Sequence, residues 1–264
     1  MTPLRLGAVS YLNTKPLVYG LDAKPEQFLI RYDIPARCAA LLDERHVDLG
    51  LVPAIEYQRG DYVLVPGVAI GSDGEIASVA VYARGPIDRV QTLAIDASSR
   101  TSVALTQILC AMRWGIAPAF VPAAPDVQAM LQRADAALVI GDNALAIDAA
   151  SHGATKIDLG SEWQALTGLP FVYAAWTGRA GVASRDHCAA LQQARDHGVA
   201  AVAELARTAG AGDPAREAQA LRYLRDNLKY GLGEAEVAGL RRFHELAAAL
   251  GLIPALKPLR FYES

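Results

Sequence analysis

Residues 5–20 read RLGAVSYLNTKPLVYG, and this stretch decides the fold. It begins with an apolar run as long as one buried β-strand, and residues 14–19 have the pattern of a short helix that Gly20 ends. A second helical pattern follows at residues 35–42 and a second apolar strand at residues 48–52. Strand, helix and strand in this order are typical of a βαβ unit, so the sequence predicts a parallel sheet.

The alternation of strand and helix continues along the chain. A helix over residues 54–59 and a strand over residues 62–70 complete the first run, and turn-forming residues separate that strand from residues 76–84. We expect residues 76–84 to cross into a second lobe. That lobe repeats the pattern, with strands over residues 92–95, 119–121 and 136–140 and helices over residues 100–114, 126–133 and 143–150.

An apolar strand over residues 171–177 is expected to lead back to the first lobe. The sequence therefore predicts an α/β protein in which residues 1–82 plus 178–264 form one lobe and residues 83–177 form the other. Two similar halves in series predict a ligand cleft between the lobes.

The last third of the chain is rich in helix-forming residues. Helical patterns follow Ser184 as far as about residue 207, follow Asp213, and span residues 234–250. Ala, Leu and Val recur at spacings of three and four residues, which is typical of helices that pack against other structure. We expect these helices to be scaffolding.

Composition and charge exclude several classes of protein. The chain has 25 basic and 28 acidic residues and a formal net charge of -3, so no broad field attracts nucleic acid or anionic lipid. No uncharged apolar run reaches the roughly 18 residues that a spanning helix needs, and the start lacks the pattern of a secretion signal. We therefore expect a cytoplasmic protein without a membrane segment or a nucleic-acid partner.

The cysteines and histidines show no pattern of a metal site. The three cysteines lie far apart inside helical patterns, where free buried thiols are expected. The five histidines lack metal-ligand spacing, and those of the last third, His244 among them, lie in polar helical stretches where exposure is expected. We predict no metal and no cofactor.

The loop after the first strand is the first candidate for a binding site. Ligands of open parallel sheets bind outside the carboxyl ends of the strands, and this loop carries Ser10, Tyr11, Asn13 and Thr14. Capping of the helix by Asn13 or Thr14 is a structural alternative. The two roles are compatible, because a capped helix start still presents backbone N–H groups to a carboxylate.

The second candidate occupies the same place in the second lobe, at the start of a long helix. Four hydroxyls and a guanidinium gather there, on Ser98, Ser99, Arg100, Thr101 and Ser102. One hydroxyl would satisfy the helix cap, so the concentration favours an anion site. Arg100 offers a bidentate contact to a carboxylate, although its guanidinium could instead pair with Asp96 or point to solvent.

Two further loops are candidates because of their position. Gly141 and Asp142 follow the apolar strand at residues 136–140; Gly141 would let the backbone approach a ligand, and Asp142 could instead cap the next helix. In the last loop before the returning strand, we expect Ser161 to cap a short helix and Trp163 to be a packing residue.

Patterns for nucleotide, ester or glycoside chemistry are missing from the sequence. It has no glycine-rich phosphate loop, no dinucleotide fingerprint, no Gly-x-Ser-x-Gly elbow and no evident carboxylate pair. Residue chemistry alone therefore predicts a small carboxylate bound between two lobes.

Five stretches resemble the chorismate dehydratases of the futalosine route to menaquinone. They match the family in order and spacing, and they are residues 7–17 (GAVSYLNTKPL), 48–54 (DLGLVPA), 96–102 (DASSRTS), 140–144 (IGDNA) and 163–171 (WQALTGLPF). The resemblance implies a two-lobed fold like type II periplasmic solute-binding proteins. It also implies a hydro-lyase that converts chorismate to 3-[(1-carboxyvinyl)oxy]benzoate with no metal or organic cofactor.

The resemblance suggests roles for the candidate residues, because chorismate is a dianion and two helix N-termini face one cleft. We hypothesise that Asn13 positions the reacting ring or a water, and that Ser78 contacts a carboxylate or the leaving hydroxyl. The base is either Asp142 or the enolpyruvyl carboxylate of the substrate itself. Substrate binding is expected from Ser10, Tyr11, Thr14, Ser98, Ser99, Arg100, Thr101 and Ser102.

Two rival interpretations stay open. One is a binding or sensor protein for small carboxylates that uses the same fold without catalysis. The other is the related 1,4-dihydroxy-6-naphthoate synthase, whose opening motif is richer in Pro and Asp around the Asn. Residues 10–13, Ser-Tyr-Leu-Asn, favour the dehydratase. The sequence makes no prediction of the oligomeric state.

Overall fold

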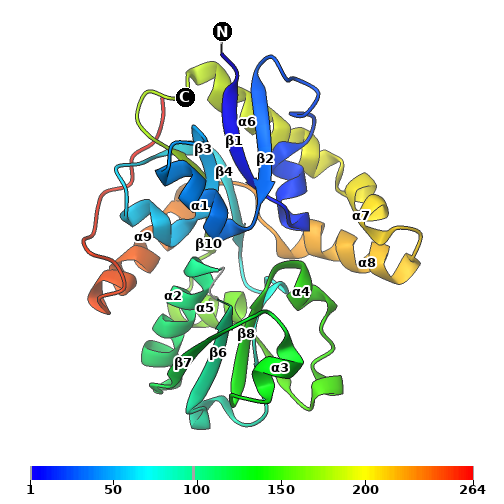
Figure 1. Ribbon diagram of the computed structural model, residues 1–264, viewed down its shortest axis with the longest axis vertical. Helices are drawn as coiled ribbons and strands as arrows, with labels where there is room; N and C mark the ends of the chain where they lie inside the picture. The colour runs from blue at the N-terminus through cyan, green and yellow to red at the C-terminus, as the bar shows by residue number, and fades with distance from the viewer. Residues whose placement is uncertain (1, 97–98, 264) are drawn as a thin grey trace.

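The chain folds into two five-stranded sheets, which lie one above the other in Figure 1. The computed structural model describes residues 2–96 and 99–263. The first sheet has the order β2 (Phe28–Asp33), β1 (Leu4–Val9), β3 (Leu49–Pro53), β10 (Phe171–Gly178) and β4 (Val63–Ser72). The second has the order β7 (Ala119–Ala123), β6 (Thr92–Asp96), β8 (Ala136–Ile140), β5 (Val79–Ala83) and β9 (Thr155–Asp158).

The first sheet is parallel where the sequence predicts a βαβ unit. β1 pairs in parallel with β2 on one side and with β3 on the other. The helix α1 (Pro35–Asp43) joins β2 to β3. β10 is the expected returning strand, and it inserts between β3 and β4 in antiparallel orientation to both.

Two strands, β2 and β9, lie outside the sequence prediction, and both are at the edges of their sheets. Leu29 and Tyr32 of β2 are 51% and 37% exposed, and β9 has no fully buried residue. An edge strand is partly open to solvent, so it lacks the apolar run or strict alternation that reveals an inner strand.

The chain crosses between the sheets earlier than expected. In the second sheet β6 is parallel to β7 and β8, whereas β5 is antiparallel to β8 and β9. The expected boundary after residue 82 falls inside β5, whose partners both belong to this sheet. The crossing therefore lies between Ser72 and Val79, and the return lies between α5 (Leu159–Thr167) and β10.

The helices of the second lobe follow the expected positions but differ in length and capping. They are α2 (Arg100–Leu109), which runs into a π-helical turn (Cys110–Trp114), α3 (Val127–Leu131), α4 (Gly141–Ala146) and α5. Ser161 was expected to cap the last of these helices, and this is wrong. Asp158 is the cap, because its Oδ1 accepts the Ser161 N–H at 3.0 Å.

Trp163 is a packing residue, as expected. Its side chain is fully buried, edge-on to the rings of Phe171 and Phe243. Its indole N–H donates to the Pro170 carbonyl at 3.2 Å, so the one polar atom of the ring is satisfied.

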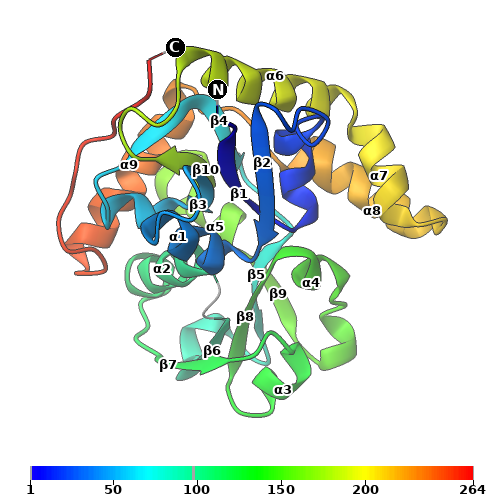
Figure 2. The same ribbon diagram turned by 45° about the horizontal axis from the view of Figure 1, so that its top comes forward.

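The C-terminal helices cover the first lobe, in which α6 (Arg185–Ala200) lies along the upper edge in Figure 2. Ser184 caps α6 as expected, but the predicted continuous helix divides at Ala201 into α6 and α7 (Val202–Gly210). A side chain on Gly198 of α6 would lie 2.1 Å from the Pro16 carbonyl oxygen. Glycine therefore allows α6 to pack directly on the 3-10 helix η1 (Leu12–Val18).

Two more helical segments complete the first lobe. α8 (Pro214–Arg222) continues into a π-helical turn, η6 (Tyr223–Asn227), and α9 (Glu234–Ala249) packs near the 3-10 helix η2 (Ala54–Gln58). His244 of α9 was expected to be exposed, and this is wrong because its side chain is 1% exposed. The ring lies between η2 and α9, with Nε2 3.0 Å from the Ala54 carbonyl and Nδ1 2.8 Å from the Gln58 amide.

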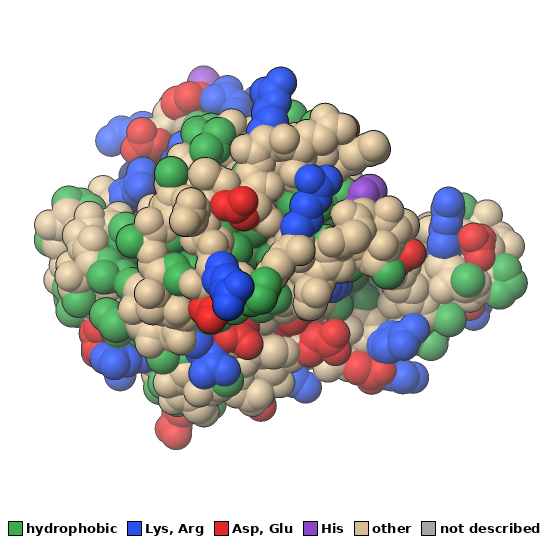
Figure 3. All heavy atoms as spheres, turned by 90° about the horizontal axis from the view of Figure 1, so that it is seen from below, with side chains coloured by type: hydrophobic (Ala, Val, Ile, Leu, Met, Phe, Trp, Pro, Cys, Tyr) green, Lys and Arg blue, Asp and Glu red, His purple; other side chains and the backbone are tan. Residues whose placement is uncertain are grey.

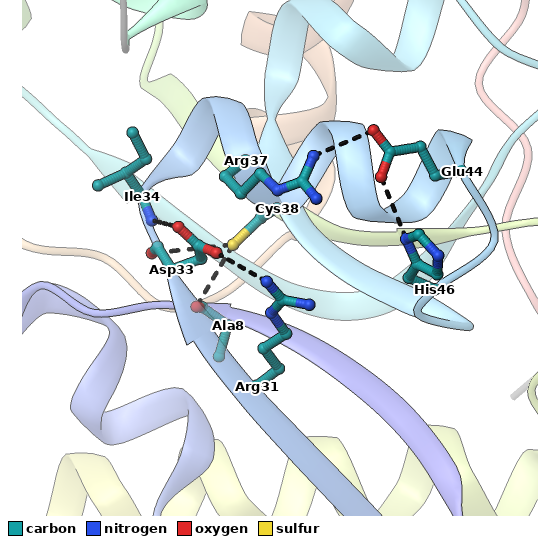
Figure 4. Close-up of polar contacts among 8 residues, drawn as sticks. All are labelled: Ala8, Arg31, Asp33, Ile34, Arg37, Cys38, Glu44 and His46. Atoms are coloured by element: carbon teal, nitrogen blue, oxygen red, sulfur yellow. Dashed lines mark hydrogen bonds and ion pairs between the residues drawn. The ribbon is translucent and has the colours of Figure 1, made fainter.

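The three cysteines are free and buried, as predicted. Figure 4 shows Cys38, whose Sγ lies 3.3 Å from the Ala8 carbonyl oxygen and 3.9 Å from that of Asp33, the last residue of β2. Burial, with a smaller contribution from the charge of Asp33, raises the pKa of the Cys38 thiol to about 12. The thiolate is the reactive form of cysteine, so this residue is inert at neutral pH.

Charged side chains of both signs are interspersed on the face seen from below in Figure 3. This distribution agrees with the small net charge of the sequence. Within residues 2–96 and 99–263, none of the helices has the length and apolar character needed to cross a membrane.

Candidate functional site

A cavity lies between the two lobes, at the carboxyl ends of β1 and β8 and beside the crossing into β5. The space between its atoms, part of which is open to solvent, is about 530 Å³. Apolar residues from both sheets form much of its wall, including Val9, Ile70 and Ile140. The polar side chains that line it are Tyr11, Asn13, Ser78, Ser99, Thr101, Ser102 and Tyr173. These groups are neutral, so the cavity offers hydroxyls and one amide to a ligand.

Tyr11 and Asn13 come from the loop after β1 and the first turn of η1, and both line the cavity, as the position after a parallel strand predicts. Thr14 is fully buried and Ser10 is exposed; neither is among the described residues that line the cavity. The Thr14 hydroxyl donates to Asn13 Oδ1 at 3.3 Å and thereby helps to orient the amide.

The start of η1 is capped from the other lobe. The suggested caps Asn13 and Thr14 do not serve, because no side chain near the helix start accepts its N–H groups. Instead, both carboxylate oxygens of Asp142 accept the Leu12 N–H at 3.2 Å. Asp142 belongs to the first turn of α4, so this contact joins the two lobes beside the cavity.

The Asp142 carboxylate lines an outer groove with Ser10 and Lys15, and it is not among the described residues of the cavity. Burial raises the pKa of Asp142, and the Leu12 N–H and the charge of Lys15 oppose this shift only in part. The suggested role of Asp142 as a cap for its own helix is wrong, because α4 has no side-chain cap.

The opposite wall of the cavity is the N-terminal turn of α2. Ser99 Oγ donates to Ser102 Oγ at 2.7 Å, and the Thr101 hydroxyl accepts the Ile55 N–H of η2 at 3.2 Å. Ser99, the residue before α2, makes no capping hydrogen bond through its side chain. The three hydroxyls therefore gather at one side of the cavity, as the sequence predicts, while Ser98 lies outside the described residues.

Arg100 points away from this wall. Its Nη1 lies 2.8 Å from Glu56 Oε2 of η2, and it lines a separate groove with Arg59. The side chain of Glu56 is 9% exposed and that of Arg100 is 39% exposed. This ion pair is a further contact between the lobes, and Arg100 is not among the described residues of the cavity.

Ser78 lies in the crossing between the lobes and is 1% exposed. The preceding residue, Ala77, has φ +65°, and the Ser78 N–H donates to the Ile76 carbonyl at 2.8 Å. These features define a γ-turn with a strained central residue. Asp158 stabilises the turn by accepting the N–H groups of Ile76 and Ala77 at 3.1 and 2.7 Å.

Tyr223 is the residue that the sequence analysis missed. It begins the π-helical turn η6 and is 1% exposed, and its hydroxyl donates to Ser78 Oγ at 2.7 Å. Burial raises the pKa of Tyr223 far above its ordinary value, so the group is a phenol at neutral pH.

Tyr173 of β10 also lines the cavity, unlike Tyr223, which is not among its described lining residues, and the Tyr173 hydroxyl lies 3.3 Å from Ser72 Oγ. No group of three or more metal-ligating side chains occurs within the described ranges, 2–96 and 99–263. The cavity can thus hold a small molecule through hydroxyl, phenol and amide hydrogen bonds, supported by the N-terminus of α2.

Sequence comparisons give two matches over most of the chain. A family model described as menaquinone biosynthesis matches residues 4–249. A chorismate dehydratase from Thermus thermophilus is 29% identical over 270 residues, which cover 96% of this chain and 97% of that protein.

Solved structures share the fold at low identity. Protein AF1704 from Archaeoglobus fulgidus has a TM-score of 0.72 at 18% identity, over 96% of this chain and 99% of that chain. The alkanesulfonate-binding protein SsuA from Xanthomonas axonopodis pv. citri, bound to MOPS, has a TM-score of 0.72 at 14% identity, over 97% and 95% of the two chains. The two-lobed fold like that of periplasmic binding proteins is therefore confirmed.

Proposed function

Because the chain belongs to the menaquinone biosynthesis family, we propose that it is a hydro-lyase that converts chorismate to 3-[(1-carboxyvinyl)oxy]benzoate and water in the futalosine route. One observation carries this proposal beyond the family. Asn13 and Ser78, which come from distant parts of the sequence, line one cavity, and Ser78 accepts a hydrogen bond from a buried phenol, Tyr223.

The proposed reaction needs little acid–base power from the protein. A ring C–H bond and a ring C–O bond break, the proton and the hydroxide leave as water, and the ring becomes aromatic. Aromaticity makes these steps strongly downhill, so orientation and help for the leaving hydroxide suffice. A cavity lined by neutral donors is consistent with such a reaction.

In this proposal Asn13 orients the ring and Ser78 donates to the leaving hydroxyl. The hydroxyls of Ser99, Thr101 and Ser102 hold one carboxylate near the start of α2. The enolpyruvyl carboxylate of the substrate takes the proton, which agrees with the absence of Asp142 from the described wall of the cavity. A general base must come within hydrogen-bond reach of the proton it removes.

The test is incubation of the purified protein with chorismate and no added cofactor, with the aromatic product followed by ultraviolet absorbance and mass. We expect turnover in the wild type. Asn13→Ala should lower kcat by about a hundredfold and change KM much less, since orientation is required chiefly in the transition state. Lack of product from folded wild-type protein, together with tight binding of another carboxylate, would instead indicate a binding protein.

A further inference from the structure

We propose that Tyr223 is a positioning residue, which holds the Ser78 hydroxyl as a hydrogen-bond donor toward the cavity. The inference rests on the proposed function and adds to it a residue from the C-terminal helices. The two oxygens are 2.7 Å apart, and the Tyr223 hydroxyl is the donor.

The direction of this hydrogen bond decides what Ser78 can do. A serine hydroxyl has one proton to donate and two lone pairs to accept with. Since the Ser78 oxygen accepts from Tyr223, its own proton is directed to another acceptor. Ser78 lines the cavity, so a ligand oxygen there is the acceptor that this geometry favours.

The two partners are held firmly on both sides of the bond. The γ-turn at Ala77, which Asp158 stabilises, sets the backbone position of Ser78. Tyr223 itself is held at the start of the π-helical turn η6. Neither Ser78 nor Tyr223 is more than 1% exposed, and water therefore does not compete for the bond.

The position of Tyr223 in η6 has a structural cause. α8 widens into a π-helical turn at this residue, and the chain then leaves the helix at Leu228. Such turns are rare and occur often at functional sites, because the extra residue redirects a side chain. The result is a chain of two hydroxyls, from Tyr223 to Ser78 and on to a departing oxygen, whose donors strengthen one another as negative charge develops.

Tyr223→Phe tests the inference because it removes one oxygen and keeps the ring. We expect kcat for chorismate to fall by about tenfold with KM almost unchanged, which is the loss of roughly one hydrogen bond in the transition state. The matched control is Tyr230→Phe. Tyr230 is 5% exposed, and its hydroxyl has no hydrogen-bond partner among the described residues, so its removal should leave kcat unchanged.

A double-mutant cycle separates positioning from simple structural support. In a Ser78→Ala background, Tyr223→Phe should have almost no further effect on kcat, whereas independent effects would multiply. Urea unfolding of the wild type, the two single variants and the double variant measures how much the hydrogen bond contributes to stability, independently of activity. Wild-type turnover with an unchanged kcat in Tyr223→Phe, or multiplying effects on kcat, would overturn the inference while the proposed function stands. Folded wild-type protein that does not turn over chorismate would contradict both the proposed function and the role of Tyr223.

Discussion

Asp142 of the second lobe accepts the backbone N–H of Leu12 in the first lobe with both of its carboxylate oxygens, each at 3.2 Å. The same side chain is a candidate base by sequence position, and the two roles make different predictions. A carboxylate that only caps η1 can be replaced by an amide, because an amide oxygen also accepts an N–H. A base cannot be replaced in this way.

Asp142→Asn should therefore keep kcat within about tenfold of the wild type, whereas loss of a general base costs about 10²–10⁴-fold. Asp142→Ala is the comparison, since it leaves the Leu12 N–H without its acceptor. We expect it to raise KM more than it lowers kcat, through weaker contact between the lobes. Steady-state kinetics of both variants distinguish a helix cap from a general base. A fall of kcat by about a hundredfold or more in Asp142→Asn would establish Asp142 as the base.

The raised pKa of Asp142 also predicts a dependence of stability on pH. The folded state favours the protonated form of Asp142. This group therefore contributes fully to the free energy of unfolding below the pKa of an unfolded aspartate, and its contribution is lost as the pH rises through the raised pKa of the folded state. Asp142→Asn removes the charge and should be at least as stable as the wild type at pH 7. The difference in unfolding free energy between Asp142→Asn and the wild type should disappear toward pH 3 in urea titrations. A difference that stays constant from pH 7 to pH 3 would contradict the raised pKa of Asp142.

Arg100 should matter more for stability than for substrate binding, because its guanidinium pairs with Glu56. Arg100→Ala is expected to cost about 1 kcal/mol of unfolding free energy, since the pair is partly exposed but leaves a buried carboxylate behind. KM for chorismate should change less than about threefold. Glu56→Gln is the matched variant and should lose a similar amount. An increase of KM by tenfold to a hundredfold in Arg100→Ala alone would show that Arg100 contacts a substrate carboxylate.

Asp158 should support both the fold and the chemistry, because it accepts the N–H groups of Ile76, Ala77 and Ser161. Asp158→Ala should lower the unfolding free energy by about 3 kcal/mol, as three buried or half-buried donors lose their acceptor. In protein that remains folded, kcat should fall more than KM changes, since Ser78 follows the turn directly. Asp158→Asn keeps one acceptor oxygen and should be intermediate in both measurements. A wild-type kcat in Asp158→Ala would show that catalysis does not depend on the γ-turn.

His244 should make the protein sensitive to mild acid. Burial is the main cause that lowers its pKa to about 4 from the ordinary 6.5, since the ring is neutral between Gln58 and the Ala54 carbonyl. The unfolded state binds the proton first as pH falls, so stability is full above about pH 6.5 and decreases toward pH 4.

The expected loss over this range is about 3 kcal/mol. Urea unfolding between pH 4 and 7 measures it, and His244→Gln should flatten the slope. A wild-type profile that is already flat would show that His244 has the same pKa in the fold as in the unfolded chain.

The sequence predicts the inner strands and the two loops of the cavity well, because local patterns specify them. β1, β3, β6 and β8 carry nearly continuous apolar runs, and polar loops follow β1 and β6 directly. The edge strands β2 and β9 lack such runs, since solvent covers part of each. The inner strands can therefore be predicted from the sequence, whereas the edge strands cannot.

The directions of individual side chains could not be predicted from local rules. Capping rules consider residues within a few positions, whereas Asp142 caps a helix 130 residues away and Arg100 meets Glu56 across 44. Tyr223 reaches Ser78 across 145 residues through a π-helical turn with no recognised sequence signal. Only tertiary packing brings these pairs together.

The insertion of β10 between β3 and β4 sets an order for assembly during synthesis. All strands of the second sheet, from Val79 to Asp158, leave the ribosome before β10 does. The first sheet is thus two separate pieces, with an unfilled gap between β3 and β4, until residue 178 has been made. Since domains fold as units in the order of synthesis, the second lobe can form first, and Ser78 gains its hydrogen bond from Tyr223 only when the last helices arrive.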